Sequence, residues 1–243
     1  MKLIPTLRLA RVFLHLFEGL ATCALVFPVV GAGRRDVLVA RWSRRLLGIC
    51  GVSVSSEGVP AAHALLAANH LSWLDIFAIN AAAPSHFVAK AEIRAWPVLG
   101  WLVAQAGTVF LARGSRRDLR ATYQGIVDQL KQGERVAFFP EGTTAAPGQL
   151  LPFHANLFEA AIDAAVPVQP LALAYLDARG RHHPAVDFSG EISFARSMLT
   201  ILAGPPVHAK LRWLAPVDSS LGNRRAVSAA TSAVIAAALD ELT

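Results

Sequence analysis

From Val52 onward, short apolar runs alternate with segments whose apolar residues recur at helical spacing. This alternation is typical of α/β proteins, in which helices cover the faces of a buried sheet. The predicted strands are 52–55, 64–68, 87–89, 108–112, 135–139, 168–174 and 209–214. The predicted helices are 73–82, 98–106, 116–132, 154–164, 194–202 and 224–242. We therefore expect a single α/β domain with a mixed, mostly parallel sheet flanked by helices.

The first 50 residues follow a different pattern. Between Arg11 and Arg34 lie 22 residues without Lys, Arg or Asp, enough for a bilayer span, which takes about 20 apolar residues. Glu18 is costly inside a membrane, so a segment embedded in one leaflet and a helical hairpin stand beside a full span as alternatives. We predict that residues 1–50 form an N-terminal membrane-associated helical segment and that residues 51–243 form the main domain.

Residues 34–48 predict an amphipathic helix, because Leu38, Trp42 and Leu46 recur every four residues and four arginines lie elsewhere around the helix. Trp and Arg both suit the headgroup region of an anionic leaflet. The alternative is an ordinary helix that packs these apolar residues on the main domain. Either arrangement keeps the main domain on the positive, cytoplasmic side of an inner membrane.

Composition narrows the functional classes. The net charge of +6 lies in the first 50 residues, whereas the main domain is balanced, which argues against nucleic-acid binding. With 54% hydrophobic residues, some apolar surface must face lipid, substrate or a partner. Cys23 and Cys50 form neither a disulfide framework nor a metal-ligand spacing, so no metal is expected.

Asn69-His70-Leu71-Ser72-Trp73-Leu74-Asp75 follows the predicted strand 64–68. His70 falls on a strand-to-helix turn, and Asp75 falls in the first helical turn, close enough to reach the imidazole. A carboxylate on one ring nitrogen fixes the tautomer and leaves the other nitrogen basic. The alternative is that Ser72 and Asp75 form a capping box, in which Asp75 only satisfies backbone donors.

Three further stretches follow predicted strands. Arg113 comes just before a helix start, where a guanidinium and backbone amides suit an anion. Phe139-Pro140-Glu141-Gly142-Thr143 ends another strand, and Gly142 permits a sharp turn and a close backbone approach. The stretch 166–171 contains two prolines, which favour an edge strand or a bulge.

Together the motifs N-H-x4-D, G-x5-R, F-P-E-G-T and V-P-V-x-P, in this order, resemble the glycerolipid acyltransferase family, which includes the 1-acylglycerol-3-phosphate acyltransferases. The resemblance covers about residues 50–175. It implies a membrane enzyme that moves a fatty acyl group from acyl carrier protein or coenzyme A to a lysolipid hydroxyl, without a bound cofactor or metal. The expected acceptor is 1-acyl-sn-glycerol-3-phosphate, which would give phosphatidate.

The resemblance also implies roles for matching positions. His70 would be the general base, Asp75 would orient it, Arg113 would bind the acceptor's phosphate, Glu141, Gly142 and Thr143 would bind acceptor or shape the site, and Pro167 would help form the acyl-binding wall. No serine or cysteine nucleophile is required, because the acceptor hydroxyl attacks the thioester directly.

Two departures keep other acceptors open. Many phosphatidate-forming members carry Arg where this chain has Thr144, and often a cation in the stretch that here is 151–154. A lysophospholipid or a lyso-ornithine lipid is therefore an alternative acceptor. A lipid hydrolase ranks lower, since Ser72 lacks the G-x-S-x-G elbow. A non-catalytic lipid-binding protein is the remaining alternative.

Overall fold

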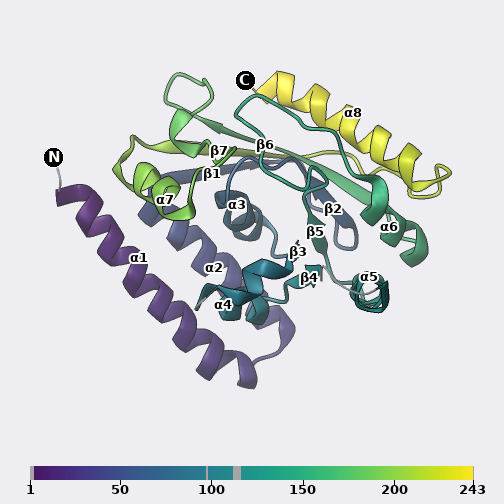
Figure 1. Ribbon diagram of the computed structural model, residues 1–243, viewed down its shortest axis with the longest axis horizontal. Helices are drawn as coiled ribbons and strands as arrows, with labels where there is room; N and C mark the ends of the chain where they lie inside the picture. Colours follow the sequence, from purple (N-terminus) through teal and green to yellow (C-terminus); the bar gives the residue numbers. More distant parts are fainter. Residues whose placement is uncertain (1–2, 97, 112–115, 243) are drawn as a thin grey trace.

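The computed structural model describes residues 3–96, 98–111 and 116–242 (Figure 1). Its strands form one seven-stranded sheet in the order β1-β7-β6-β2-β5-β3-β4. Their bounds are β1 Val52–Glu57, β2 Leu65–Ala68, β3 His86–Lys90, β4 Val109–Leu111, β5 Val136–Phe138, β6 Val168–Leu176 and β7 Val207–Trp213. Neighbouring strands are parallel except β6 and β7, which are antiparallel. The prediction of a mixed, mostly parallel sheet is confirmed.

Helices cover both faces of this sheet (Figure 1). Their bounds are α1 Leu3–Ala21, α2 Ala32–Cys50, α3 Leu74–Ala82, α4 Leu99–Gln105, α5 Arg116–Lys131, α6 Glu159–Ala164, α7 Phe194–Ala203 and α8 Arg224–Leu242. The predicted helix 154–164 begins instead as the 3₁₀ helix η4, Ala155–Phe158, a tighter turn that is common at helix starts. The sheet therefore lies between two helical layers.

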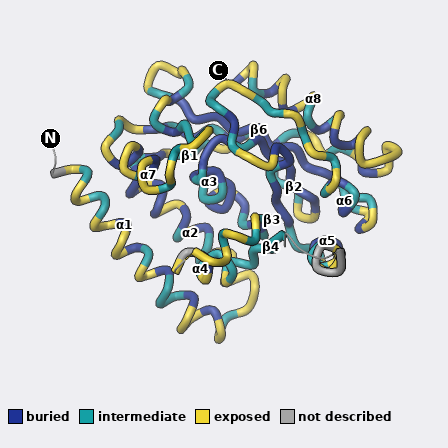
Figure 2. Tube along the Cα trace, in the orientation of Figure 1, coloured by how far each residue is buried: buried dark blue, intermediate teal, exposed yellow. Residues whose placement is uncertain are grey.

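The central strand β2 shows why its sequence is apolar without alternation. Leu66 and Ala68 belong to the core that includes α3, whereas Leu65 and Ala67 belong to the core that includes α5 and α6. Successive side chains of a strand point to opposite faces, so a strand covered on both faces buries every residue. Figure 2 shows this buried centre in dark blue.

The prolines of 166–171 do not mark an edge strand, and that part of the expectation is wrong. A bulge is consistent with the pairing, because two residues between Val168 and Leu171 lie opposite three between Trp213 and Val217. β6 lies inside the sheet between β7 and β2, with every residue buried. The Pro170 carbonyl accepts a bond from the Leu214 N–H at 3.0 Å. Pro170 cannot return an N–H to Leu214, but the buried Gln169 side chain donates to the Leu214 carbonyl at 3.3 Å instead.

The N-terminal segment packs on the main domain. α1 contacts α2 and α7, and Leu46 and Leu47 of α2 belong to the same core as the strands. The alternative of an ordinary packing helix therefore describes the buried side of α2. His15 Nε2 bonds the Trp42 carbonyl at 2.9 Å, and the two rings stack with centroids 4.6 Å apart. The described segment shares its core with the rest of the chain.

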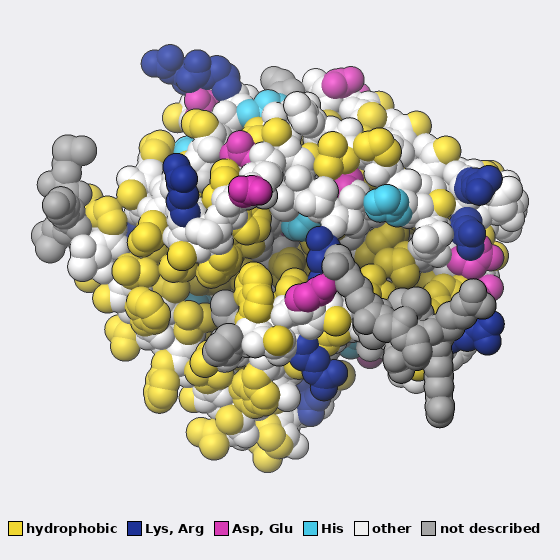
Figure 3. Space-filling view, in the orientation of Figure 1, with side chains coloured by type: hydrophobic (Ala, Val, Ile, Leu, Met, Phe, Trp, Pro, Cys, Tyr) yellow, Lys and Arg dark blue, Asp and Glu magenta, His cyan; other side chains and the backbone are white. Residues whose placement is uncertain are grey.

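The outer side of α1 remains apolar and uncovered. Residues Ile4–Val29 are long and apolar enough to cross a membrane, and 28% of their most apolar 18-residue window is buried. Phe13, Leu14 and Phe17 are 61%, 70% and 71% exposed. Glu18 pairs with Arg45 of α2 at 2.9 Å instead of standing alone in the apolar run. Figure 3 shows the hydrophobic side chains gathered over α1 and α4.

Candidate active site

His70 lies on the turn between β2 and α3, as predicted. Its Nδ1 lies 2.7 Å from Asp75 Oδ2, and Asp75 is completely buried. An ionised carboxylate can only accept, so the bond assigns the proton of the neutral imidazole to Nδ1 and leaves a lone pair on Nε2. Within the described residues, His70 forms hydrogen bonds through its backbone N–H and its Nδ1, and none through Nε2. This nitrogen can therefore take a proton from a substrate.

Asp75 also does what the capping alternative predicted. Its Oδ2 accepts the N–H of Leu71 at 2.7 Å and that of Ser72 at 2.9 Å, which satisfies donors at the start of α3. Its Oδ1 accepts the hydroxyl of Tyr175 at 2.8 Å. One carboxylate thus closes the turn and bonds the imidazole, whereas Ser72 does not form the other half of a capping box, because its Oγ lies against the Leu74 N–H.

Glu141 fixes the backbone of the same turn. Its Oε1 accepts the His70 N–H at 2.6 Å, and its Oε2 accepts the Leu151 N–H at 2.7 Å. Burial raises the pKa of Glu141, although the two backbone N–H bonds act in the opposite direction. The position of Glu141 fits the shaping role, because both of its oxygens are already bonded to the protein.

Aromatic rings connect His70 to an apolar cavity. Phe139, after β5, stacks on the imidazole with centroids 3.9 Å apart and planes at 10°. Phe87 of β3 stacks in turn on Phe139, with centroids 5.9 Å apart. Phe87 also lines the cavity. The imidazole thus has a flat apolar neighbour that continues into the interior.

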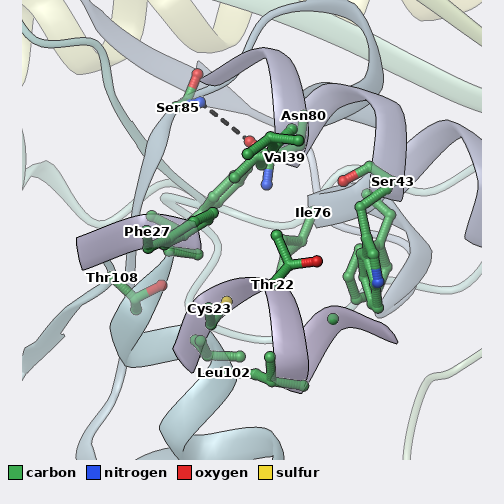
Figure 4. Close-up of a pocket in the computed structure, with 17 residues that line it drawn as sticks. Thr22, Cys23, Phe27, Val39, Ser43, Ile76, Asn80, Ser85, Leu102 and Thr108 are labelled. Atoms are coloured by element: carbon green, nitrogen blue, oxygen red, sulfur yellow. Dashed lines mark hydrogen bonds between the residues drawn. The ribbon is translucent and has the colours of Figure 1, made fainter. Parts of the chain in front are cut away.

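The cavity has a volume of about 120 Å³ and lies between the helical hairpin of α1 and α2 and the elements α3, β3 and α4. Its lining is almost wholly apolar and includes Cys23, Phe27, Ile76 and Leu102 (Figure 4). One polar lining group, the Asn80 amide, is bonded to the Ser85 N–H at 3.0 Å. Such a cavity suits a hydrocarbon chain.

The loop after β5 carries the other predicted residues. Gly142 has φ +69°, a conformation that favours glycine, and a Cβ there would meet the His154 ring at 3.2 Å. Thr143 is exposed. The Thr144 hydroxyl donates to the Phe188 carbonyl at 2.7 Å. The Ala145 N–H donates to the His70 carbonyl at 2.8 Å, which places this loop beside the histidine.

Of the remaining predicted residues, one cannot be placed and one lies away from His70. Arg113 lies outside the described residues. Pro167 precedes β6, and its carbonyl accepts the N–H of Leu65 at 3.0 Å. Leu65 begins β2, whereas His70 follows its end. Pro167 therefore lies at the amino-terminal ends of the parallel strands, and His70 lies at their carboxyl-terminal ends.

Sequence reasoning gave no role to Asn69 and Phe139, although both lie in the quoted motifs, and it missed Tyr175. The Asn69 side chain bonds the backbone of Leu173 in both directions, at 2.9 and 2.8 Å. Tyr175 ends a strand that is otherwise apolar, and a buried tyrosine hydroxyl needs a partner. That requirement was the available signal, whereas the partner, 100 residues away, was not visible in the sequence.

The fold and the site define a class of protein. It is an α/β protein with a histidine–carboxylate pair at the carboxyl end of a central strand and an apolar cavity beside it. Ser72, the nearest hydroxyl in the turn, directs its Oγ to the Leu74 N–H at 3.4 Å. The arrangement therefore suits general-base chemistry on a hydroxyl that the substrate supplies.

The chain belongs to the acyltransferase family, whose model matches residues 51–174. It is 37% identical over 186 residues to a lyso-ornithine lipid O-acyltransferase of Pseudomonas aeruginosa, covering 76% of this chain and 71% of the relative. It is 51% identical over 117 residues to a 1-acyl-sn-glycerol-3-phosphate acyltransferase of Neisseria gonorrhoeae, covering 48% of this chain and 46% of the relative. The chain thus spans about half the length of that relative.

A solved structure shows the same fold. The crystal structure of the 1-acyl-sn-glycerophosphate acyltransferase PlsC of Thermotoga maritima matches with a TM-score of 0.71 and covers 98% of both chains at 20% identity. The match includes the N-terminal helices together with the sheet, because it extends over nearly the whole chain.

Proposed function

We propose that this protein transfers a fatty acyl group from a thioester to the free hydroxyl of a lysolipid. The observation that carries the proposal is the 2.7 Å bond between His70 Nδ1 and Asp75 Oδ2, which leaves Nε2 as a base. Relatives named 1-acyl-sn-glycerol-3-phosphate acyltransferase and lyso-ornithine lipid O-acyltransferase support the proposal. The thioester is that of acyl carrier protein or coenzyme A, and no metal or bound cofactor takes part.

In the proposed reaction, His70 Nε2 takes the proton of the acceptor hydroxyl as its oxygen attacks the thioester carbonyl carbon. The carbon–sulfur bond then breaks, and the imidazolium returns the proton to the departing thiolate. Asp75 stabilises the imidazolium between these two steps. No side chain becomes acylated, so Ser72 needs no activation.

The apolar cavity is the proposed site for the acyl chain. Phe27, Ile76 and Phe87 line the cavity with apolar side chains. The stacked rings of Phe87, Phe139 and His70 connect the cavity to the proposed base. Burying each methylene of a chain contributes about 0.8 kcal/mol. The cavity therefore supplies binding free energy and sets where the thioester carbonyl lies.

The leading acceptor is 1-acyl-sn-glycerol-3-phosphate, and the product would be phosphatidate. A lyso-ornithine lipid is the second candidate, because Thr144 supplies no cation and its hydroxyl is bonded to the Phe188 carbonyl. The relative from P. aeruginosa, which bears that name, also covers more of this chain. For either acceptor we place the protein on the cytoplasmic face of the inner membrane, held by α1.

The test is acyl transfer by purified protein in mixed micelles, with both thioester donors and three acceptors: lysophosphatidate, a lysophospholipid and lyso-ornithine lipid. His70→Ala should abolish transfer while circular dichroism stays unchanged. The control is His208→Ala, because His208 bonds Ser53 and Ser55 at the edge of the sheet. A His70→Ala variant that keeps most of its turnover would exclude His70 as the base.

The acceptors separate the two candidates. Turnover of lysophosphatidate supports the phosphatidate-forming function in spite of Thr144. Turnover of lyso-ornithine lipid alone would replace it with the second candidate.

A further inference from the structure

Among the residues that the structure describes, four donors bond the Asp75 carboxylate, and they come from the turn after β2 and from β6. Three of them, His70 Nδ1 and the N–H groups of Leu71 and Ser72, belong to its own turn and all bond Oδ2. The fourth is the hydroxyl of Tyr175 on β6, which bonds Oδ1 at 2.8 Å and is the one of the four that does so. The turn thus holds one oxygen of the carboxylate, and Tyr175 holds the other.

The sheet delivers Tyr175 to this point. Leu171, Leu173 and Tyr175 face the core that contains α3, whereas the residues between them face α8. The Asn69 side chain is bonded in both directions to the backbone of Leu173. This pair of hydrogen bonds ties the residue before His70 to β6, the strand that carries Tyr175. The position of the turn relative to Tyr175 is therefore fixed by the backbone of β6 as well as by the Tyr175 side chain.

Tyr175 is chemically suited to act as a donor. It is 2% exposed, and burial together with the adjacent Asp75 raises its pKa well above the ordinary value of 10.0. The hydroxyl therefore keeps its proton at every pH at which the protein would work. Without a donor on Oδ1 the carboxylate is held through Oδ2 alone, so its plane can tilt about the Cβ–Cγ bond and weaken the bond to the imidazole.

We propose that Tyr175 is a positioning residue of this site, which locks the Asp75 carboxylate so that Oδ2 holds His70 in the Nδ1–H tautomer. The effect on turnover rests on the proposed function, whereas the effect on the imidazole does not. Tyr175 does not touch substrate. Its influence is exerted through Asp75 and is separate from the ring packing that a phenylalanine would keep.

The chain offers a matched control. Its two tyrosines each donate to an aspartate, since Tyr123 of α5 bonds Asp163 of α6 at 2.6 Å. Tyr123→Phe removes the same atom and the same kind of bond in a place outside the site. The comparison of Tyr175→Phe with Tyr123→Phe therefore isolates the bond to Asp75.

Tyr175→Phe should lower kcat by roughly 10- to 100-fold, the effect of a small misplacement of a catalytic group, with KM for both substrates unchanged. Tyr123→Phe should keep the wild-type kcat. In ¹⁵N spectra of histidine-labelled protein, His70 should show the single Nδ1–H tautomer in wild type and in Tyr123→Phe, and a mixture of tautomers in Tyr175→Phe.

A single Nδ1–H tautomer in folded Tyr175→Phe would overturn the proposal, as would equal losses of kcat in the two variants. The spectra require no turnover. If wild type transferred no acyl group, the proposed function would fail while the tautomer comparison still decided the role of Tyr175.

Discussion

At the scale of single residues, two buried carboxylates each accept a hydrogen bond from His70. Asp75 holds the imidazole, and Glu141 holds the backbone N–H of the same residue. A side chain with two fixed points keeps its free nitrogen in one place, and catalysis depends on such placement. Glu141 is therefore expected to act on the position of His70 without touching substrate.

Glu141→Gln should lower both stability and turnover. The amide has one acceptor oxygen for two N–H donors, so its NH₂ group would face a donor at His70 or at Leu151. A buried group left unpaired costs about 1–3 kcal/mol, and urea unfolding should show a loss of this size. The control is Glu191→Gln, at an exposed position. Equal stability of the two variants would contradict this role of Glu141.

His70 and Asp75 could be predicted from the sequence because they lie within one turn, where spacing alone limits their separation. Tyr175 could not, since its contact with Asp75 depends on which face of β6 meets α3. The same limit applies to Pro167. Its motif follows the others in the sequence, yet the parallel register places Pro167 at the amino-terminal ends of the strands, away from His70.

At the scale of elements, β6 shows how a strand can contain a proline and remain inside a sheet. Gln169 supplies the donor that Pro170 lacks, and it also bonds Val59 and Ala61. The sequence predicted this strand from its apolar run. The repair by a neighbouring side chain became visible only once Leu214 was placed beside Pro170.

Gln169→Leu should therefore reduce the free energy of unfolding by about 2–4 kcal/mol, because several buried backbone groups lose their partner. In a Pro170→Ala background the same change should cost less, since an alanine in place of the proline restores an N–H for the Leu214 carbonyl. Urea unfolding of the four proteins of this cycle measures the difference. Additive losses would show that Gln169 does not replace the missing donor.

The cavity allows a test of the helical hairpin. Cys23 lies on the π-helical turn η1, Thr22–Val26, and lines the cavity. Cys23→Phe should shorten the space for the chain. Excluding two methylenes at about 0.8 kcal/mol each lowers kcat/KM about tenfold.

The comparison is between long and short donors in this one variant. A palmitoyl donor should lose activity, whereas an octanoyl donor should keep it. Equal losses for both donors would mean that the acyl chain lies elsewhere.

At the scale of the whole molecule, the uncovered apolar surface that we propose faces the membrane is built on α1. The sequence predicted the apolar segment, but it left open whether α2 lies on lipid or on protein. The structure shows α2 contributing Leu46 and Leu47 to the core, and Arg8 of α1 donating to the Leu202 carbonyl of α7 at 3.0 Å. Deleting α1 would therefore expose core residues, and a loss of membrane binding could not be separated from unfolding.

Substitution on the outer side of α1 avoids this problem. Phe17→Glu should weaken co-sedimentation with anionic vesicles, because it replaces about 2 kcal/mol of apolar burial with a charge. Leu221→Glu is the control, since Leu221 is 57% exposed and precedes α8. Equal sedimentation of both variants would show that α1 does not hold the protein on the bilayer.

The pairing of the first strand with the last has a consequence for biosynthesis. Val52 of β1 lies opposite Val207 of β7, and β1 is an edge strand whose neighbour is β7. At about 5–20 residues per second, a ribosome needs on the order of 10 s to deliver that partner after β1 has emerged. The apolar α1 leaves the exit tunnel earlier still. If α1 binds lipid as proposed, a nascent chain of this protein reaches the bilayer before its sheet can be completed, and the membrane then covers the apolar helix while the fold is unfinished.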